Sequence, residues 1–233
     1  MSAEFFRALA RRAAARYGSD RFARHFAYFK LTGDPAFRHL VQSGLLAGRE
    51  RLLDLGCGQG MLEALLAAAH EAREPWPRDW AARPAPRAIE GIELDPRALR
   101  RARAAADGHA RFVHGDIRSA AFAEADAIVI LDVLHYIDPS AQDAVLERAR
   151  GSIAPGGVLL LRVADARPTL RFRATIALDR LSLWLRGHRT GPYHCRPLEA
   201  WIAHLEALGL AVEARPMSAG TPFANVLLVA RAA

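Results

Sequence analysis

The sequence contains little cysteine and lysine, and it has no long apolar run. Its two cysteines, Cys57 and Cys195, are too few for a disulfide framework or a cysteine-based zinc site, and we expect no metal. No window reaches the roughly 18 consecutive apolar residues of a membrane span. The arginine-rich N-terminal segment also lacks the apolar core of a secretory signal. These absences predict a cytoplasmic protein without a membrane span.

Positive charge is carried almost entirely by arginine. Lys30 is the single lysine among 32 basic residues, a bias typical of a GC-rich bacterial genome, and the formal net charge is +7. A basic surface attracts nucleic acid, anionic membrane, an acidic carrier protein or an acidic small substrate. The charge alone therefore does not identify a partner.

The order of apolar patterns predicts an α/β fold. Short apolar runs alternate with stretches of helical spacing, as in a parallel sheet with helical crossovers. The expected strands are 51–55, 88–93, 110–114, 126–131, 157–163, 210–215 and a last one ending at Val229. The expected helices between and after them are 60–73, 96–106, 139–151 and 197–208, whereas the segment 74–87, with four prolines, is expected to be a loop.

Two helical additions accompany this predicted sheet. Helical spacing near residues 3–17, 20–30 and 35–43 predicts an N-terminal cap over 1–48, with Pro35 at the start of its third helix. The remaining residues, 49–233, would form the main domain. An amphipathic helix near 168–185 lies in an insert at about 166–195, which we expect to cover the site.

A glycine-rich turn follows the first predicted strand. The turn holds Gly56, Gly58 and Gly60, and such a strand–turn–helix junction binds nucleoside cofactors at the carboxyl edge of a parallel sheet. The dinucleotide-binding pattern needs a glycine at position 61, where the chain has Met61. The turn therefore favours a nucleoside cofactor other than a nicotinamide dinucleotide.

Later strands end in acidic residues that fit such a cofactor. Glu93 follows the second strand, where a carboxylate can accept hydrogen bonds from two ribose hydroxyls. Asp116 follows the third strand and is expected near an adenine amine, with the Ile117 amide near a ring nitrogen. Leu131 and Asp132 end the fourth strand and are expected to face the reacting end of the cofactor.

The order and spacing of these residues resemble the class I S-adenosylmethionine-dependent methyltransferases over about residues 50–165, with a D-x-G-C-G-x-G motif typical of the small-molecule branch. The resemblance implies a Rossmann-like, seven-stranded, mostly parallel sheet with helices on both faces. It implies S-adenosylmethionine as cofactor and S-adenosylhomocysteine as product. The residues that it places at the cofactor are Asp54, Gly56, Cys57, Gly58, Gly60, Glu93, Leu94, Asp116, Ile117, Leu131 and Asp132.

Candidate catalytic residues follow from the chemistry of a sulfonium methyl. Because that methyl is already activated, the enzyme mainly aligns the reactants, and only a weak nucleophile needs a base. His135, after the fourth strand, is the first candidate, although a His-Tyr pair there also fits local packing; His194 is the second. Cys195 lacks the motif context of a nucleophile. In the N-terminal cap, Tyr28, Phe29 and Arg38 could close over the cofactor or substrate; the alternative is that these side chains pack in the core.

These residues are compatible with three functions. We favour methyl transfer to a small-molecule acceptor, preferably to oxygen, with a polyketide-like or aromatic substrate either free or on an acidic carrier protein. A nucleic-acid (RNA) methyltransferase is disfavoured. The segment after Leu131 lacks the Asn/Asp-Pro-Pro-aromatic motif of exocyclic-amine methylases, and the lysine-containing tetrad of 2′-hydroxyl methylases is excluded in that form because Lys30 is the only lysine. A catalytically inactive cofactor-binding scaffold would not need the intact glycine and acid set. The acceptor and the oligomeric state are not predicted.

Overall fold

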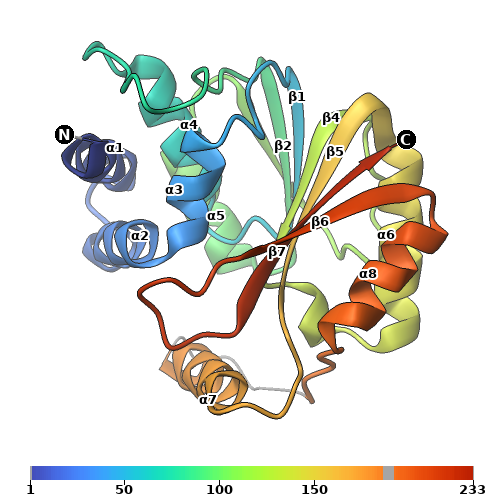
Figure 1. The fold of residues 1–233 in the computed structure, drawn as a ribbon. Helices are drawn as coiled ribbons and strands as arrows, with labels where there is room; N and C mark the ends of the chain where they lie inside the picture. Colours follow the sequence, from blue (N-terminus) through green and yellow to red (C-terminus); the bar gives the residue numbers. More distant parts are fainter. Residues whose placement is uncertain (1, 186–191, 233) are drawn as a thin grey trace.

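A computed structural model describes residues 2–185 and 192–232 (Figure 1). Its centre is a seven-stranded sheet of order β3-β2-β1-β4-β5-β7-β6, in which β7 alone runs opposite to the other strands. The strands are β1 (Arg51–Leu55), β2 (Ala88–Glu93), β3 (Ala110–His114), β4 (Ala125–Leu131), β5 (Ile153–Ala164), β6 (Leu210–Pro216) and β7 (Asn225–Ala232). This topology confirms the predicted Rossmann-like, mostly parallel α/β fold.

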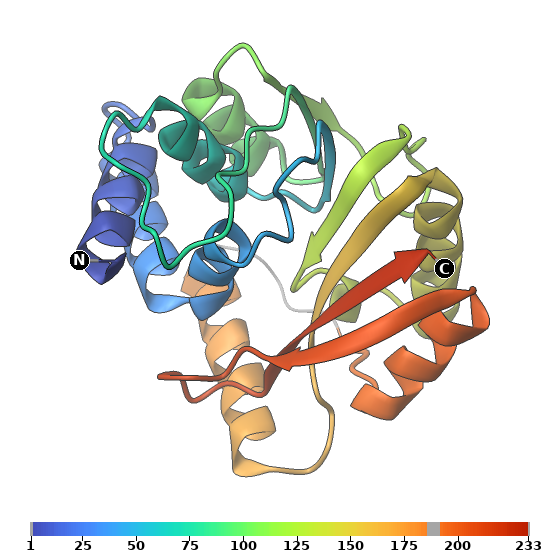
Figure 2. The same cartoon turned by 45° about the horizontal axis from the view of Figure 1, so that its top comes forward.

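Helices cover both faces of the sheet (Figures 1 and 2). They are α1 (Ser2–Ala15), α2 (Arg21–Gly33), α3 (Pro35–Gln42), α4 (Met61–Glu71), α5 (Pro96–Ala105), α6 (Pro139–Ser152), α7 (Leu170–Leu185) and α8 (Leu198–Ala207), with the short 3-10 helix η1 (Leu134–Tyr136) after β4. None of the described helices is long and apolar enough to cross a membrane.

Alternating residues of the central strands supply two separate cores. In β4, Ala127 and Val129 join the core formed with α1 to α4, whereas Ile128 and Ile130 join the core formed with α6 and α8. Successive side chains of a strand point to opposite faces, so a strand covered on both sides is apolar throughout. The N-terminal helices thus share the core on one sheet face, with α1 packed against α4 and α2 packed against α1 and α3. The division of the chain at residue 48 stays a prediction.

Three helices begin at an Asp-Pro pair. Asp34, Asp95 and Asp138 each accept a backbone hydrogen bond from the first turn of α3, α5 and α6, and proline occupies the first helical position. Proline has no N–H to leave unpaired there, and an N-cap carboxylate contributes roughly 1 kcal/mol. These pairs explain why the predicted helix starts agree closely with the structure.

The start of β5 differs from the prediction. We expect a strand from 157, but β5 begins at Ile153, and its register against β4 shifts between the Ala125–Ile153 and Ala127–Val158 pairs. The irregular segment includes Gly156, with φ of 71°. Proline and glycine mark a turn in sequence, and here they form a bulge inside a strand. The helix predicted near 168–185 matches α7, while residues 186–191 of the predicted insert lie outside the described chain and the bounds of the insert stay a prediction.

Candidate functional site

The glycine turn, Gly56 to Gly60, follows the end of β1, and the segment that follows β4 passes directly beside it. Gly56 has φ of 77°, and a Cβ placed on it would overlap Cγ2 of Val133. Gly58 has φ of 59° and open space where its side chain would be. The turn therefore needs glycine at Gly56 for the chain crossing and leaves room for a ligand beside Gly58.

Glu93 holds the turn from the end of β2. One carboxylate oxygen accepts the Gly58 N–H at 2.8 Å, and the other accepts the Asp95 N–H at 2.7 Å. The Gly56 N–H also donates to the carbonyl of Ile92 at 2.8 Å. The predicted ribose acid and the predicted glycine turn are thus neighbours, with a carboxylate next to the open side of the turn.

A buried carboxyl pair lies beneath the same turn. Asp54 at the end of β1 and Glu63 in α4 are both buried, and their two negative charges would repel each other there, which favours the protonated form of the pair. Burial raises the pKa of Asp54 well above its ordinary value and that of Glu63 to about 7. The sequence predicts Asp54 at the site but gives no sign of Glu63, because a glutamate in a helix is normally exposed.

The other predicted cofactor residues occupy both buried and exposed positions. Cys57 is buried, and burial raises the pKa of its thiol. Gly60, with φ of 74°, is the N-cap residue of α4. Leu94 is exposed after β2, and Leu131 is half-buried at the end of β4. All four lie in or directly beside the carboxyl ends of β1, β2 and β4.

Asp116 and Ile117 follow β3 as predicted. The Asp116 carboxylate accepts the backbone N–H of Arg118 at 2.9 Å and pairs with its guanidinium, and hydrogen bonding to Arg118 lowers the pKa of Asp116. The Ile117 side chain is buried, and its carbonyl accepts a hydrogen bond from Arg148. Arg118 would have to share Asp116 with an adenine amine, so the adenine contact stays a prediction.

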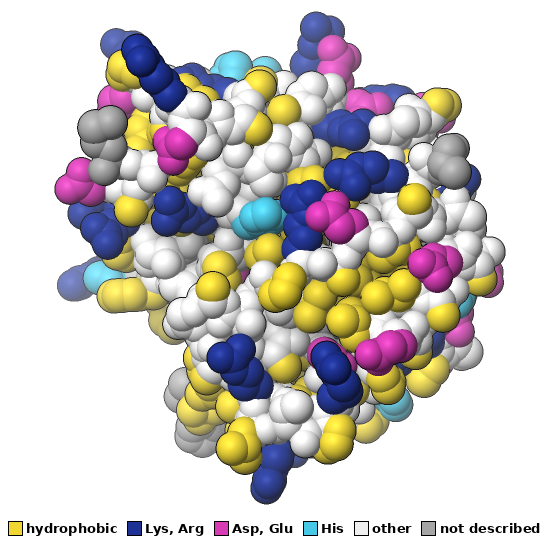
Figure 3. All heavy atoms as spheres, in the orientation of Figure 1, with side chains coloured by type: hydrophobic (Ala, Val, Ile, Leu, Met, Phe, Trp, Pro, Cys, Tyr) yellow, Lys and Arg dark blue, Asp and Glu magenta, His cyan; other side chains and the backbone are white. Residues whose placement is uncertain are grey.

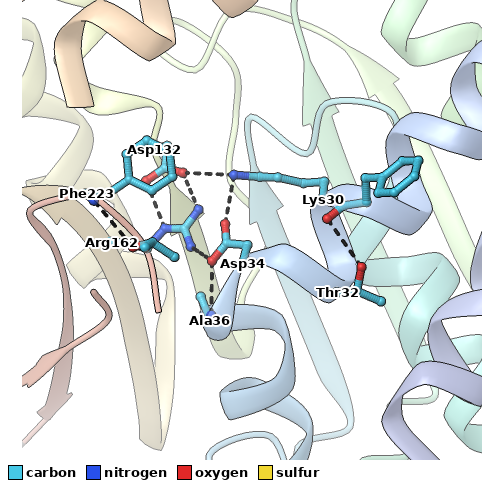
Figure 4. A network of polar contacts seen from close by, with 9 residues as sticks. Lys30, Thr32, Asp34, Ala36, Asp132, Arg162 and Phe223 are labelled. Carbon is cyan, nitrogen blue, oxygen red and sulfur yellow. Dashed lines mark hydrogen bonds and ion pairs between the residues drawn. The ribbon is translucent and has the colours of Figure 1, made fainter. Parts of the chain in front are cut away.

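Asp132 lies in a four-residue charge network (Figure 4). Its φ is 58°, in the left-handed region that non-glycine residues rarely occupy. Arg162 from β5 donates to one oxygen of Asp132 at 2.8 Å and contacts the other, and it donates to Asp34 at 2.5 Å. The Lys30 amine lies 2.8 Å from Asp34 and 3.8 Å from Asp132.

This network joins the N-terminal helices to the sheet edge. Lys30 belongs to α2, Asp34 caps α3, and Arg162, only 1% exposed, lies in β5. Burial raises the pKa of Asp34, but Arg162 and Lys30 together lower it well below its ordinary value. Two cations balance two anions, which allows an arginine inside an otherwise apolar strand. The sequence signals were the arginine within the apolar run of β5 and the single lysine.

His135 and His194 lie in one cluster after β4. The His135 ring stacks on Tyr193 with centroids 5.4 Å apart, and the backbone N–H of His194 donates to the carbonyl of His135 at 2.9 Å. Buried Gln142 in α6 reaches the carbonyls of Leu134, Ile137 and His194 at 2.7 to 3.0 Å. The two predicted histidines are therefore neighbours, fixed by a glutamine that sequence analysis missed.

The cap contacts the glycine turn through residues other than those predicted. The Tyr17 hydroxyl donates to the Gln59 carbonyl at 2.9 Å, and the Gln59 side chain donates to the Ala23 carbonyl at 3.1 Å. Tyr28 packs against the core, and Arg38 bonds to Gln42 and Ser2. A tyrosine in the turn after an alanine-rich helix gives no sequence signal for such a contact.

Comparison with known proteins agrees with this geometry. A family model described as a methyltransferase domain matches residues 7–215. A Mycobacterium tuberculosis protein named as an uncharacterized methyltransferase is 33% identical over 135 residues, which are 57% of this chain and 59% of that protein. The chain thus matches less than two thirds of that relative's length.

Solved structures share the fold. An O-methyltransferase family protein from Burkholderia thailandensis matches with a TM-score of 0.64 and 19% identity over 96% of this chain and 64% of that one. The magnesium protoporphyrin IX methyltransferase of Synechocystis, with bound S-adenosylhomocysteine, matches with a TM-score of 0.60 and 17% identity over 95% of this chain and 93% of that one. Because the family model spans most of its residues, the chain belongs to the methyltransferase-domain family.

Proposed function

We propose that this protein transfers the methyl group of S-adenosylmethionine to a small-molecule acceptor, with oxygen as the favoured atom. The observation that carries the proposal is the Glu93 carboxylate beside the open, glycine-only side of the turn at Gly58. A ribose needs such an acceptor of two hydroxyl hydrogen bonds, next to a backbone that a ligand can approach. Membership of the methyltransferase-domain family supports the same assignment.

The residues present fit the cofactor. Glu93 would take the ribose, the turn at Gly56 to Gly60 and Asp54 the methionine part, and Asp116 with Ile117 the adenine. When bound, S-adenosylmethionine supplies a methyl group already activated by its sulfonium. The protein's own contribution is to align the acceptor, which can supply several kcal/mol of the barrier reduction.

The His135 cluster is our candidate for the acceptor side. Val133, in the segment that leaves β4, lies against Gly56 of the glycine turn. His135 follows it by two positions, in η1, so the histidine cluster begins close to that turn. A neutral histidine can remove a proton from a hydroxyl acceptor near neutral pH. An acceptor delivered on an acidic carrier protein is the second form of this proposal, since the basic surface would attract such a carrier.

Replacing Glu93 by alanine tests the cofactor site. We expect S-adenosylhomocysteine to bind at least tenfold more weakly, because two hydrogen bonds to a charged acceptor are lost. Isothermal titration calorimetry measures the Kd directly. Glu90→Ala, on the same strand beside Arg111, is the matched control and should leave the Kd unchanged. A Glu93→Ala Kd within twofold of the wild-type value would remove Glu93 from the site.

Replacing His135 by alanine tests the base. With a hydroxyl acceptor found by screening for S-adenosylhomocysteine release, we expect kcat to fall about a hundredfold, the usual contribution of a general base. The Kd for S-adenosylhomocysteine should stay within twofold. His109→Ala, a surface change after α5, is the control. An equal loss of kcat and cofactor affinity would assign His135 to packing.

A further inference from the structure

Helix α7 presents an apolar stripe to solvent. Leu170, Leu178 and Leu181 are 82%, 40% and 50% exposed. At about 100° per residue these three leucines, with Ala174 and Ala177 between them, share roughly 100° of the helix circumference. Such a width is normal for a stripe that faces a core, but here it faces outward.

The opposite side of α7 is attached to the protein, which fixes the direction of the stripe. Phe172 and Ile176 are half-buried. The Thr175 hydroxyl accepts the Ala224 N–H at 3.0 Å, so the helix is held by the segment between β6 and β7, and Arg171, at the border of the stripe, also donates to Ser218 of that segment at 3.2 Å. The exposed leucines therefore do not result from a helix that is turned the wrong way.

Exposed arginines border the stripe on both sides. By helical position Arg171 lies next to Leu178 on one side, whereas Arg173 and Arg180 lie on the other. Figure 3 shows apolar and basic side chains intermixed at the lower end of the molecule, where Figure 1 places α7. An exposed apolar stripe flanked by basic residues suits the interface of an anionic membrane, and the opposite side of α7, with Phe172 and Ile176, is apolar because it packs on the protein.

The arrangement fits a lipid surface better than a second copy of the chain. A two-fold contact through the stripe would bring arginine borders against arginine borders, because both flanks are basic. Anionic headgroups satisfy both borders at once, while the leucines enter the acyl boundary. The formal net charge of +7 adds a long-range electrostatic attraction between the protein and the anionic surface.

The stripe is also connected to the candidate site. α7 follows β5, whose carboxyl end carries Arg162 near Asp132. The Arg180 guanidinium lies 5.3 Å from the centre of the Tyr193 ring, and that ring stacks on His135. A surface seated on α7 would therefore lie beside the residues that we assign to the acceptor.

We propose that α7 docks the protein on an anionic lipid bilayer, with the leucine stripe in the interface and the arginines at the headgroups. The helix lies on the membrane and does not span it. Where the proposed methyl transfer holds, this geometry selects amphiphilic acceptors that are themselves held in the bilayer; that part rests on the proposed function, but the docking does not.

Vesicle co-sedimentation tests the docking with the full chain. Vesicles of phosphatidylcholine with one third phosphatidylglycerol should bind the protein at least tenfold more tightly than pure phosphatidylcholine, and added salt should weaken the binding. Leu178→Ser/Leu181→Ser and, separately, Arg173→Glu, which leaves the Arg171–Ser218 contact in place, should each lose at least tenfold in partition. Arg87→Ala/Arg111→Ala, which removes two exposed arginines elsewhere, should lose much less.

Each other outcome overturns the docking proposal. Absence of binding to anionic vesicles at low salt would contradict it. Equal losses of binding in the α7 variants and in the control variant would also contradict it, because the attraction would then come from the whole basic surface and not from α7. Binding of an acidic acyl carrier protein through α7 without vesicle binding would assign the stripe to that partner. A dimer in sedimentation that the leucine variant dissociates would assign it to self-association. The Kd for S-adenosylhomocysteine, measured on the same variants, reports the proposed function separately and should not change.

Discussion

The Arg162→Met variant is expected to lose about 3 to 5 kcal/mol of unfolding free energy, the usual cost of removing one partner from a buried ion pair. Methionine fills much of the arginine volume but removes the guanidinium that hydrogen-bonds to both Asp34 and Asp132, and it leaves Asp34 paired with Lys30 alone. Lys30 remains, and its amine lies 3.8 Å from Asp132, too far for a direct hydrogen bond. Chemical denaturation followed by far-UV circular dichroism measures the change.

Two further variants separate charge from packing. Arg51→Met removes a surface arginine that pairs with Glu124 and Asp126 and should change the midpoint of unfolding little. Arg162→Met combined with Asp34→Asn and Asp132→Asn removes the uncompensated charges and should recover part of the loss. A loss below about 1 kcal/mol for Arg162→Met alone would contradict the buried network.

The Glu63→Gln variant is expected to be more stable than the wild type above neutral pH, by up to about 3 kcal/mol. In the folded protein the pKa of Glu63 is raised to about 7 by burial, above its ordinary value of 4.5 in the unfolded chain. In the wild type, the proton on Glu63 therefore makes its full contribution to stability below about pH 4.5. That contribution is lost as the pH rises from there through about 7. The amide group introduced by the substitution carries no charge and can donate to Asp54 at every pH.

The measurement is urea unfolding of both proteins from about pH 5 to about pH 9, a range that spans the titration. The stability difference should be small at the acid end and should grow through neutral pH. Glu71→Gln, on the same helix but exposed and paired with Arg16, is the control and should show no such trend. Parallel pH profiles for wild type and Glu63→Gln would show that the buried pair does not titrate with folding.

Much of the fold could be predicted because its elements have strong local signals. The strands of the parallel sheet are continuous apolar runs, and three of the helices start at Asp-Pro pairs. The glycine turn and Glu93 could be predicted together because carboxyl ends of neighbouring parallel strands meet at one edge. The contact of Glu93 with Gly58 in the structure follows from that rule.

Other parts of the site depend on contacts between distant segments. Arg162 and Asp34 are 128 positions apart, and no local pattern pairs them. Gln142 bridges η1 to His194 from a helix position that gives no sign of burial. The bulge at the start of β5 was missed for the opposite reason, because proline and glycine there gave a strong turn signal that the sheet overrode.

Lys30 gives the molecule a natural reporter. It is the single lysine of the chain, so apart from the α-amino group it carries the one primary amine available to acylating reagents. That amine lies 2.8 Å from Asp34, where α2, α3 and β5 meet, with its side chain about one third exposed. We expect its rate of acylation to rise when this junction opens, because the ion pairs with Asp34 and Asp132 are then broken. One label at one known position would report movement of the N-terminal helices against the sheet, without an engineered probe.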